Sequence, residues 1–134
     1  MFNRKKQPPI KSLIAHGSQI DGHFSFAEGL RVDGGVNGNI SSVAEQPSIL
    51  VISESAVVTG EVTADHIIVN GQVNGPVHAR VMLELQPKAR VVGDVTYKAL
   101  EMHQGALVDG RLSPIVTGVE SVDKPTLKLA ANNP

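Results

Sequence analysis

The sequence contains no cysteine and no tryptophan, and it has few aromatic residues of any kind. Without cysteine the chain has neither a disulfide framework nor a thiolate nucleophile, which fits a reducing cytoplasm. Aromatic residues make up only 3% of the chain, although hydrophobic residues make up 41%. Because globular cores normally rely on aromatic rings for bulk, these proportions favour a narrow interior filled by stacked Val, Ile and Leu.

Long apolar runs are also absent, so the sequence predicts no membrane-spanning segment. The N-terminal stretch MFNRKKQPPIKS is basic but is not followed by an apolar region, so we do not expect a secretory signal. Helical periodicity is hard to find between residues 13 and 113, where frequent glycines would penalise a helix. The chain is therefore expected to be an all-β protein.

Two short units recur along most of the chain. The first is apolar-x-Gly-x-apolar, and its central residues are Gly22, Gly34, Gly38, Gly60, Gly71, Gly75, Gly93 and Gly110. The second is apolar-x-apolar, and it begins at Leu13, Leu30, Leu50, Ile67, Leu83 and Leu100. From Leu50 onward its starting positions are 50, 67, 83 and 100, which advance by 17, 16 and 17. This regularity indicates an internal repeat.

The two remaining intervals fit the same repeat. The step from position 13 to position 30 is again 17, which predicts that Leu13 and Leu30 occupy equivalent positions. The step from position 30 to position 50 is longer, at 20, and we interpret residues 41–47 (SSVAEQP) as a surface insertion.

The repeat predicts a β-helix. Alternating β-branched residues indicate short strands, and a period near 17 leaves room for about three strands in each coil. Each coil would pair in parallel with the previous one, with glycines at the corners. About six coils spaced ~4.8 Å apart would form a rod roughly 25–30 Å long. A meander of hairpins is the structural alternative, but it would not require similar residues to recur at a fixed period.

The net charge of −1 conceals an uneven distribution. Residues 1–12 carry four basic side chains and no acidic one, whereas residues 13–113 carry eleven acidic and six basic side chains, a net charge of −5. We predict a disordered basic arm (1–12), a folded domain (13–113) and a disordered C-terminal tail (114–134). The acidic body argues against nucleic acid as a partner, because a nucleic-acid groove needs clustered bases.

No amphipathic helix at either end of the repeat could cover the stack. The terminal coils are therefore expected to expose unpaired backbone groups and an apolar cross-section, which favours end-to-end polymerisation. The predicted polymer interface comprises Leu13, Ile14, Ile20, Phe24 and Phe26 in the first coil, and Leu100, Met102, Leu107, Val108 and Leu112 in the last. Filling of the first coil's core is an equally good explanation for Phe24.

The glycine repeats together resemble those of the bactofilins, bacterial cytoskeletal proteins that form polymers. The resemblance covers roughly residues 13–113 and rests on EGLRVDGGVNGNI (28–40), HIIVNGQVNGPVHA (66–79) and ARVVGDVTYKALEMHQGALVDGRL (89–112). It implies a single-stranded, right-handed parallel β-helix of triangular cross-section. It also implies nucleotide-independent filaments without overall polarity, and a scaffold for cell shape or for cell-envelope proteins such as peptidoglycan hydrolases.

Many bactofilins begin with a short Met-Phe-basic segment that targets the inner membrane. The residues Met1, Phe2, Arg4, Lys5 and Lys6 resemble this segment. The resemblance implies that they are membrane-binding residues, with anionic lipid as the partner. It places the protein in the cytoplasm, peripherally on the cytoplasmic face of the inner membrane.

The candidates for metal binding and catalysis are weak. No two of the histidines lie at a recognised ligand spacing such as i, i+4, so we expect them on exposed faces or corners. They are His16, His23, His66, His78 and His103. Several Asp and Asn residues adjoin the glycines but lack the nonapeptide rhythm of a calcium-binding β-roll, so we interpret them as turn formers. They are Asp21, Asp33, Asn37, Asn70, Asn74 and Asp109. We therefore predict no enzyme, no metal site and no cofactor.

The alternative class is the hexapeptide-repeat acyltransferases, which are also triangular β-helices. Residues 51–62 (VISESAVVTGEV) resemble two consecutive hexapeptide repeats. However, those enzymes keep a strict six-residue register, carry an extruded loop and usually end in a helix. The period here is nearer 17, and the tail VTGVESVDKPTLKLAANNP makes a poor helix.

Overall fold

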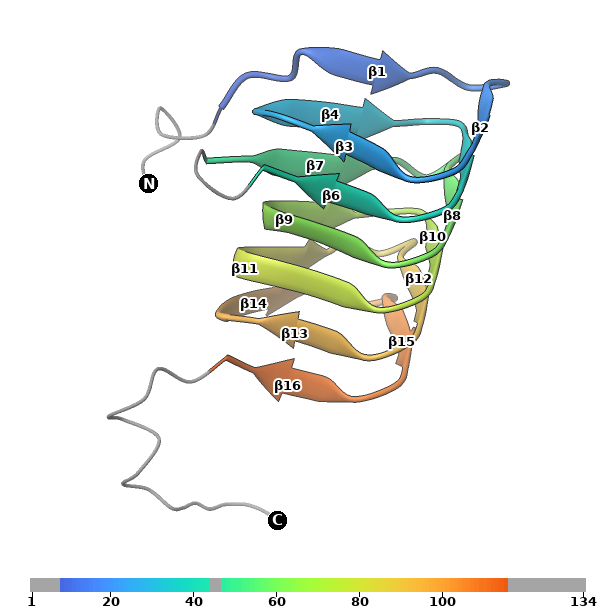
Figure 1. Ribbon diagram of the computed structural model, residues 1–134. Helices are drawn as coiled ribbons and strands as arrows, with labels where there is room; N and C mark the ends of the chain where they lie inside the picture. Colours follow the sequence, from blue (N-terminus) through green and yellow to red (C-terminus); the bar gives the residue numbers. More distant parts are fainter. Residues whose placement is uncertain (1–7, 44–46, 116–134) are drawn as a thin grey trace, which may run out of the picture.

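The computed structural model describes residues 8–43 and 47–115. All regular structure in these ranges is β, and the strands stack as six coils of a parallel β-solenoid with β1 and β16 at opposite ends (Figure 1). This confirms the predicted all-β fold and the predicted number of coils. No helix among the described residues could span a membrane.

Each coil contributes one strand, or part of one, to each of three faces. Face A contains β1 (Ser12–Ile14), β4 (Gly29–Val32), β7 (Ile49–Ile52), β14 (Ala99–Met102) and the second halves of β9 (Val62–Val69) and β11 (Val77–Leu85). Face B contains β2 (Gln19–Asp21), β5 (Gly35–Asn37), β8 (Val57–Thr59), β10 (Gln72–Asn74), β12 (Arg90–Val92) and β15 (Leu107–Asp109). Face C contains β3 (Phe24–Phe26), β6 (Ile40–Ser42), β13 (Val95–Tyr97), β16 (Leu112–Pro114) and the first halves of β9 and β11.

The strand register follows the sequence repeat in five of the six coils. Leu30, Leu50, Ile67, Leu83 and Leu100 are successive partners on neighbouring strands of face A. The first coil differs. Ser12, not Leu13, pairs with Leu30, and Leu13 pairs with Arg31. The predicted equivalence of Leu13 and Leu30 is therefore wrong, because Ile14 takes the inward position and turns Leu13 outward.

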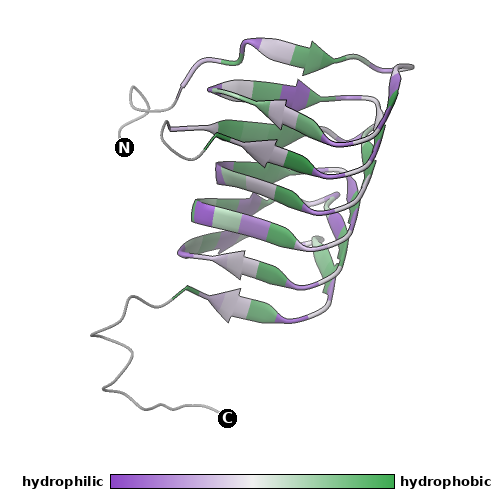
Figure 2. Cartoon of the chain, viewed as in Figure 1, coloured by the Kyte–Doolittle hydropathy of each residue, from purple (hydrophilic) through white to green (hydrophobic). Residues whose placement is uncertain are grey.

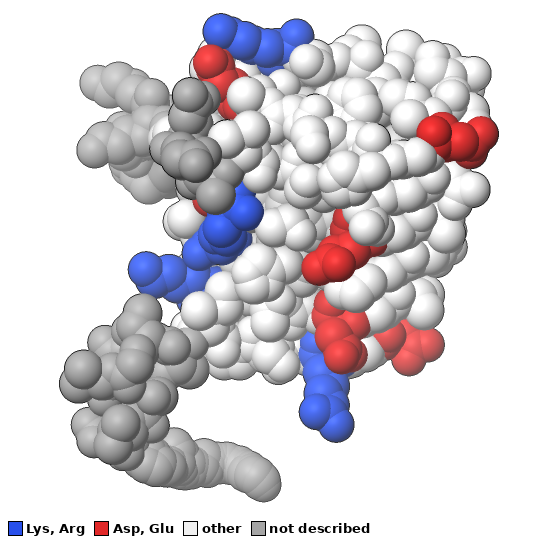
Figure 3. Space-filling view, in the orientation of Figure 1, with Lys and Arg blue, Asp and Glu red and all other residues white. Residues whose placement is uncertain are grey.

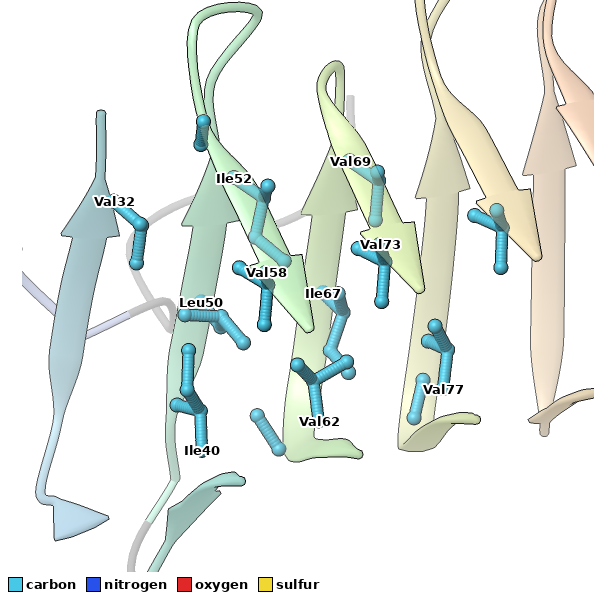
Figure 4. Close-up of a cluster of buried hydrophobic side chains, with 14 of the residues drawn as sticks. Val32, Ile40, Leu50, Ile52, Val58, Val62, Ile67, Val69, Val73 and Val77 are labelled. Atoms are coloured by element: carbon cyan, nitrogen blue, oxygen red, sulfur yellow. The ribbon is translucent and has the colours of Figure 1, made fainter. Parts of the chain in front are cut away.

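The core consists of aliphatic columns that run along the rod. Side chains from the three faces point into a common interior (Figure 4). Buried and more exposed residues alternate along strands such as β9 and β11, and hydrophobic and hydrophilic residues are interspersed along the strands (Figure 2). One column, for example, passes through Val36, Val58, Val73 and Val91, which are at most 1% exposed. Since the coils are only ~4.8 Å apart, a branched aliphatic side chain already fills each level.

The glycines of the repeat form a second column at the corner between faces B and C. A Cβ atom on Gly38, Gly60, Gly75 or Gly93 would lie 2.1–2.5 Å from the carbonyl oxygen of the preceding glycine in the column. These four residues also have positive φ angles of 147–155°. Stacked carbonyl groups thus leave no space for a side chain, which explains why the sequence repeats glycine at this position.

The corner between faces C and A holds a network of polar side chains. Arg80 Nε donates to Asp65 Oδ1 at 2.8 Å, and Arg80 also donates to the Ser42 hydroxyl. The fully buried Ser48 donates its hydroxyl to Ser42 at 2.9 Å and accepts the backbone N–H of Asp65 at 2.9 Å. The network crosses consecutive coils, and it satisfies polar groups that would otherwise be costly to bury.

The same corner contains an irregularity in the strand register. The register between β9 and β11 shifts between Ala79 and Met82, where Arg80 and Val81 together face Asp65 alone. The extra residue places the Arg80 guanidinium over the Asp65 carboxylate. A β-bulge of this kind redirects a side chain at the cost of one ladder position.

The described body extends slightly beyond the predicted limits of 13 and 113. The backbone N–H of Lys11 donates to Gly29 O at 3.0 Å, and that of Ile115 donates to Tyr97 O. Lys11 also forms an ion pair with Glu28 at 3.0 Å. The remainder of the predicted arm and tail lies outside the described residues, apart from the short stretch at residues 8–11.

Candidate assembly surfaces

The C-terminal end of the rod is an open apolar cross-section. Four interior columns end there, at Leu100, Met102, Val108 and Leu112. Met102 is 43% exposed and Leu112 is 45% exposed, whereas their column neighbours Leu85 and Val95 are fully buried. The exposure arises because no further described coil covers these residues, so another apolar surface placed on this end would bury them.

The N-terminal end is more closed. Ile14 and Phe26 are only 5% and 6% exposed, and they belong to the hydrophobic core. Ile20 and Phe24 are partly buried and pack against it. The first coil therefore uses its two phenylalanines to fill core volume, which the sequence alone left open for Phe24.

Two residues of the predicted interface lie away from the end columns. Leu13 is 58% exposed and Leu107 is 59% exposed. Leu107 pairs with Arg90 on the outer side of face B, and Leu13 pairs with Arg31 on the outer side of face A. Both can contribute to an end-to-end contact only at its rim. The whole predicted interface stays a prediction.

The predicted membrane-binding residues Met1, Phe2, Arg4, Lys5 and Lys6 lie outside the described residues. Pro9, three residues before β1, lies next to Gly29 of β4, with its carbonyl oxygen close to where a Cβ atom of Gly29 would be. On the face in view, basic side chains occur as separate small groups rather than as a continuous groove (Figure 3). The expected absence of a nucleic-acid partner stays a prediction.

Two of the six predicted turn formers, Asp33 and Asn70, lie at the corner between faces A and B. The other four are the last residues of strands on face B, which corrects the prediction for Asp21, Asn37, Asn74 and Asp109. The Asn70 side-chain oxygen accepts the backbone N–H of Lys88 at 2.9 Å, one coil further on. Asp33 lies 3.0 Å from Arg31 Nε. A hydrogen bond from the Ser53 side chain, together with Arg31, holds the pKa of Asp33 below its usual range despite the opposing effect of burial.

The histidines have different surroundings, which the spacing argument did not separate. His16 and His23 are exposed, while His78 lies 2.8 Å from the Thr96 hydroxyl. His103 lies between Glu84 and Glu101, at 3.0 and 3.2 Å. A search for ligands close in sequence missed this cluster. The available signal was that positions 84 and 101 differ by one repeat length, so that the two glutamates stack.

A shallow groove of about 450 Å³ lies next to this cluster on the outer side of face A. Its walls are mostly aliphatic, with Ile68, Val81 and Met82 beside His66 and the two glutamates. The groove is a surface depression between strands and contains no nucleophile paired with a base among its lining residues.

Comparison with known proteins decides the family. A model described as "Bactofilin: Polymer-forming cytoskeletal" matches residues 12–113, which is most of the chain and coincides with the six coils. The chain belongs to the bactofilin family. The protein is 29% identical to bactofilin BacO of Myxococcus xanthus (strain DK1622) over 111 residues, covering 83% of this chain and 85% of that protein. No solved structure matches it significantly.

The family assignment confirms the resemblance inferred from the glycine repeats. Bactofilins are polymer-forming cytoskeletal proteins, so this chain falls in a structural, cytoskeletal family. The matched limits also agree with the first and last strands, since β1 begins at Ser12 and β16 ends at Pro114.

Proposed function

We propose that this bactofilin assembles end to end into nucleotide-independent filaments on the cytoplasmic face of the inner membrane. The observation that carries the proposal is the open apolar end formed by Leu100, Met102, Val108 and Leu112. The filament would act as a scaffold for cell shape or for positioning cell-envelope proteins, including peptidoglycan hydrolases.

The strand edges at both ends support the same proposal. β14, β15 and β16 close the last coil, and β1, β2 and β3 form the first. Each has a hydrogen-bonding partner on one side only within the described chain. Unpaired edge strands above an apolar core form a template for a second copy. Such contacts bury apolar surface and complete β ladders together.

The unequal ends favour a filament without overall polarity. If the open C-terminal end meets its own copy, the exposed Met102 and Leu112 side chains of both subunits become buried against apolar surface. A two-fold junction of this kind is isologous, because both subunits use the same surface. The more closed N-terminal ends then meet each other, and the two junction types alternate along the filament.

Filaments should form without nucleotide. The expected driving force is burial of apolar end surface plus strand pairing, and neither requires a bound phosphate or metal. We expect purified full-length protein in chelator, with neither ATP nor GTP, to sediment as polymer and to form filaments in negative-stain images. A strict requirement for either nucleotide, or discrete trimers under all conditions, would contradict the proposal.

The proposed membrane anchor is the arm of Met1, Phe2, Arg4, Lys5 and Lys6. Each basic side chain near an anionic surface contributes about 1 kcal/mol, and burial of a phenylalanine contributes about 1.5–3 kcal/mol. After the entropic cost of ordering the arm, one copy would bind weakly. A filament presents many arms at once, so effective concentration raises the overall affinity. Membrane binding should therefore depend on assembly.

Two variants test this coupling. Deletion of residues 1–7 should leave filaments intact but reduce co-sedimentation with anionic liposomes at least tenfold. A polymerisation-defective variant that keeps its arm should also remain in the supernatant, because single arms bind weakly. Added salt should weaken wild-type binding, since it screens the charges. If the deleted polymer sediments with liposomes as well as wild type does, another surface must make the contact.

A further inference from the structure

Glu84, Glu101 and His103 converge on the outer side of face A, across the last two coils. Glu84 on β11 and Glu101 on β14 are direct partners in the parallel ladder, so their carboxylates stack on the same side. His103 Nε2 lies 3.0 Å from Glu84 Oε2 and 3.2 Å from Glu101 Oε2. One ligand atom from each of the three side chains lies within 4.8 Å of the others.

An ion pair between His103 and one glutamate leaves the second carboxylate without a hydrogen-bond donor from the imidazole ring. A ring nitrogen carries at most one hydrogen, yet two carboxylate oxygens approach the same Nε2 atom. One hydrogen therefore has to be shared or given to one glutamate only. The two carboxylates also occupy directly paired strand positions, where like charges repel. A divalent cation would provide two charges and could bind all three ligand atoms.

Hydrogen bonds position the backbone of His103 and the side chain of Glu84. The backbone N–H of His103 donates to Leu85 O at 2.8 Å, and His103 O accepts the N–H of Ala106 at 3.1 Å. The Gln86 side-chain amide donates to Glu84 Oε2 at 3.2 Å. The side chains of Glu84, His103 and Glu101 are 24%, 38% and 54% exposed, so an ion can enter from solvent. Preset ligands of this kind reduce the ordering cost of binding.

We propose that these three residues form a binding site for a divalent transition-metal ion of the zinc class. Ligands 2.0–2.2 Å from a tetrahedral zinc ion are roughly 3.3–3.6 Å apart, close to the 3.0 and 3.2 Å separations from Nε2. One imidazole and two carboxylates suit zinc and leave a fourth position for water. Calcium and magnesium fit less well, because they prefer six or more oxygen ligands.

Binding at this site would clamp the last coil to the preceding one. Glu84 belongs to the fifth coil, while Glu101 and His103 belong to the sixth. The sixth coil has no covering neighbour in the described chain, so it is the part of this end that an added cross-link would stabilise most. The site lies on the outer face, and the inference does not depend on filament formation.

The test is a zinc titration of chelator-treated full-length protein, followed by calorimetry and thermal unfolding. We expect one zinc ion per chain and a rise in melting temperature of at least about 5 °C at saturation. Amide exchange should slow in residues 99–109. Glu101→Gln, which keeps the size of an exposed side chain, and His103→Ala should each lower zinc affinity at least tenfold. Magnesium should produce no shift.

His78→Ala is the matched control, because His78 contacts Thr96 on a different face of the same region. This variant should bind zinc as wild type does. Equal zinc affinity in wild type, Glu101→Gln and His103→Ala would overturn the proposal, as would the absence of saturable binding in wild type. If His103→Ala lowers the melting temperature while zinc leaves that of wild type unchanged, the cluster is an ion pair only.

Discussion

Leu112→Glu should abolish filaments while leaving the β-solenoid folded. Leu112 ends an interior column and is 45% exposed at the open C-terminal end. In a filament this position would be buried against a second copy, where an unpaired carboxylate costs several kcal/mol. In the single chain the carboxylate can reach water through the same open end. We therefore expect a soluble subunit with a wild-type circular-dichroism spectrum and no polymer after ultracentrifugation.

Val57→Glu is the matched control for this prediction. Val57 has the same 45% exposure, but it lies on the outer side of face B in the third coil, between Gly35 and Gln72. This variant should form filaments at the wild-type concentration. Phe26, also predicted at the interface, is a poor test position because it is only 6% exposed and a charge there would disrupt the first coil. Long filaments of Leu112→Glu would show that this end does not form a junction.

Gly75→Ala should destabilise the solenoid strongly. The new Cβ atom would lie 2.2 Å from Gly60 O, a backbone atom that cannot move without displacing the neighbouring coil. Gly75 also has a φ of +155° and donates its N–H to Val92 O at 2.8 Å. We expect a loss of about 3 kcal/mol or more in the free energy of unfolding.

Gly22→Ala separates steric overlap from backbone strain. Gly22 begins the same column with a φ of +120°, but a Cβ atom there would meet nothing within 4 Å, because no described coil lies before it. Only the positive φ should matter, at a cost of about 1–2 kcal/mol. Thermal unfolding of both variants, each combined with Leu112→Glu to remove the contribution of assembly, measures the difference. Equal losses would show that stacking of the corner carbonyls does not require glycine.

The repeat and its chemistry can be read from the sequence because they are local. Alternation of Val, Ile and Leu sets the inward positions, and it correctly predicts partners such as Leu50 and Ile67. The recurrence of glycine follows from one steric requirement that every coil meets at the same corner. The near-constant repeat period then indicates a parallel solenoid, because an arrangement of hairpins does not require equivalent residues to recur at a fixed spacing.

The first coil shows where local pattern is insufficient. Leu13 and Ile14 are adjacent and both apolar, so the alternation rule does not choose between them. Pairing with the second coil decides the choice, because Ile14 lies beside Val32 in the interior and leaves Leu13 outside. The same context places both phenylalanines of this coil toward the core, with Phe26 buried and Phe24 packed against it.

By itself, then, the sequence determined the solenoid, its coil number, its glycine corner and its membership of the bactofilins. Only the tertiary structure decided which terminal side chains stay exposed, how Arg80 reaches Asp65 and Ser42, and which histidine meets two carboxylates. The reason is physical. Stacked positions are separated by a whole coil of chain, and one bulge or corner residue within that coil changes which side chains meet. The local sequence pattern does not show where such a bulge or corner residue lies.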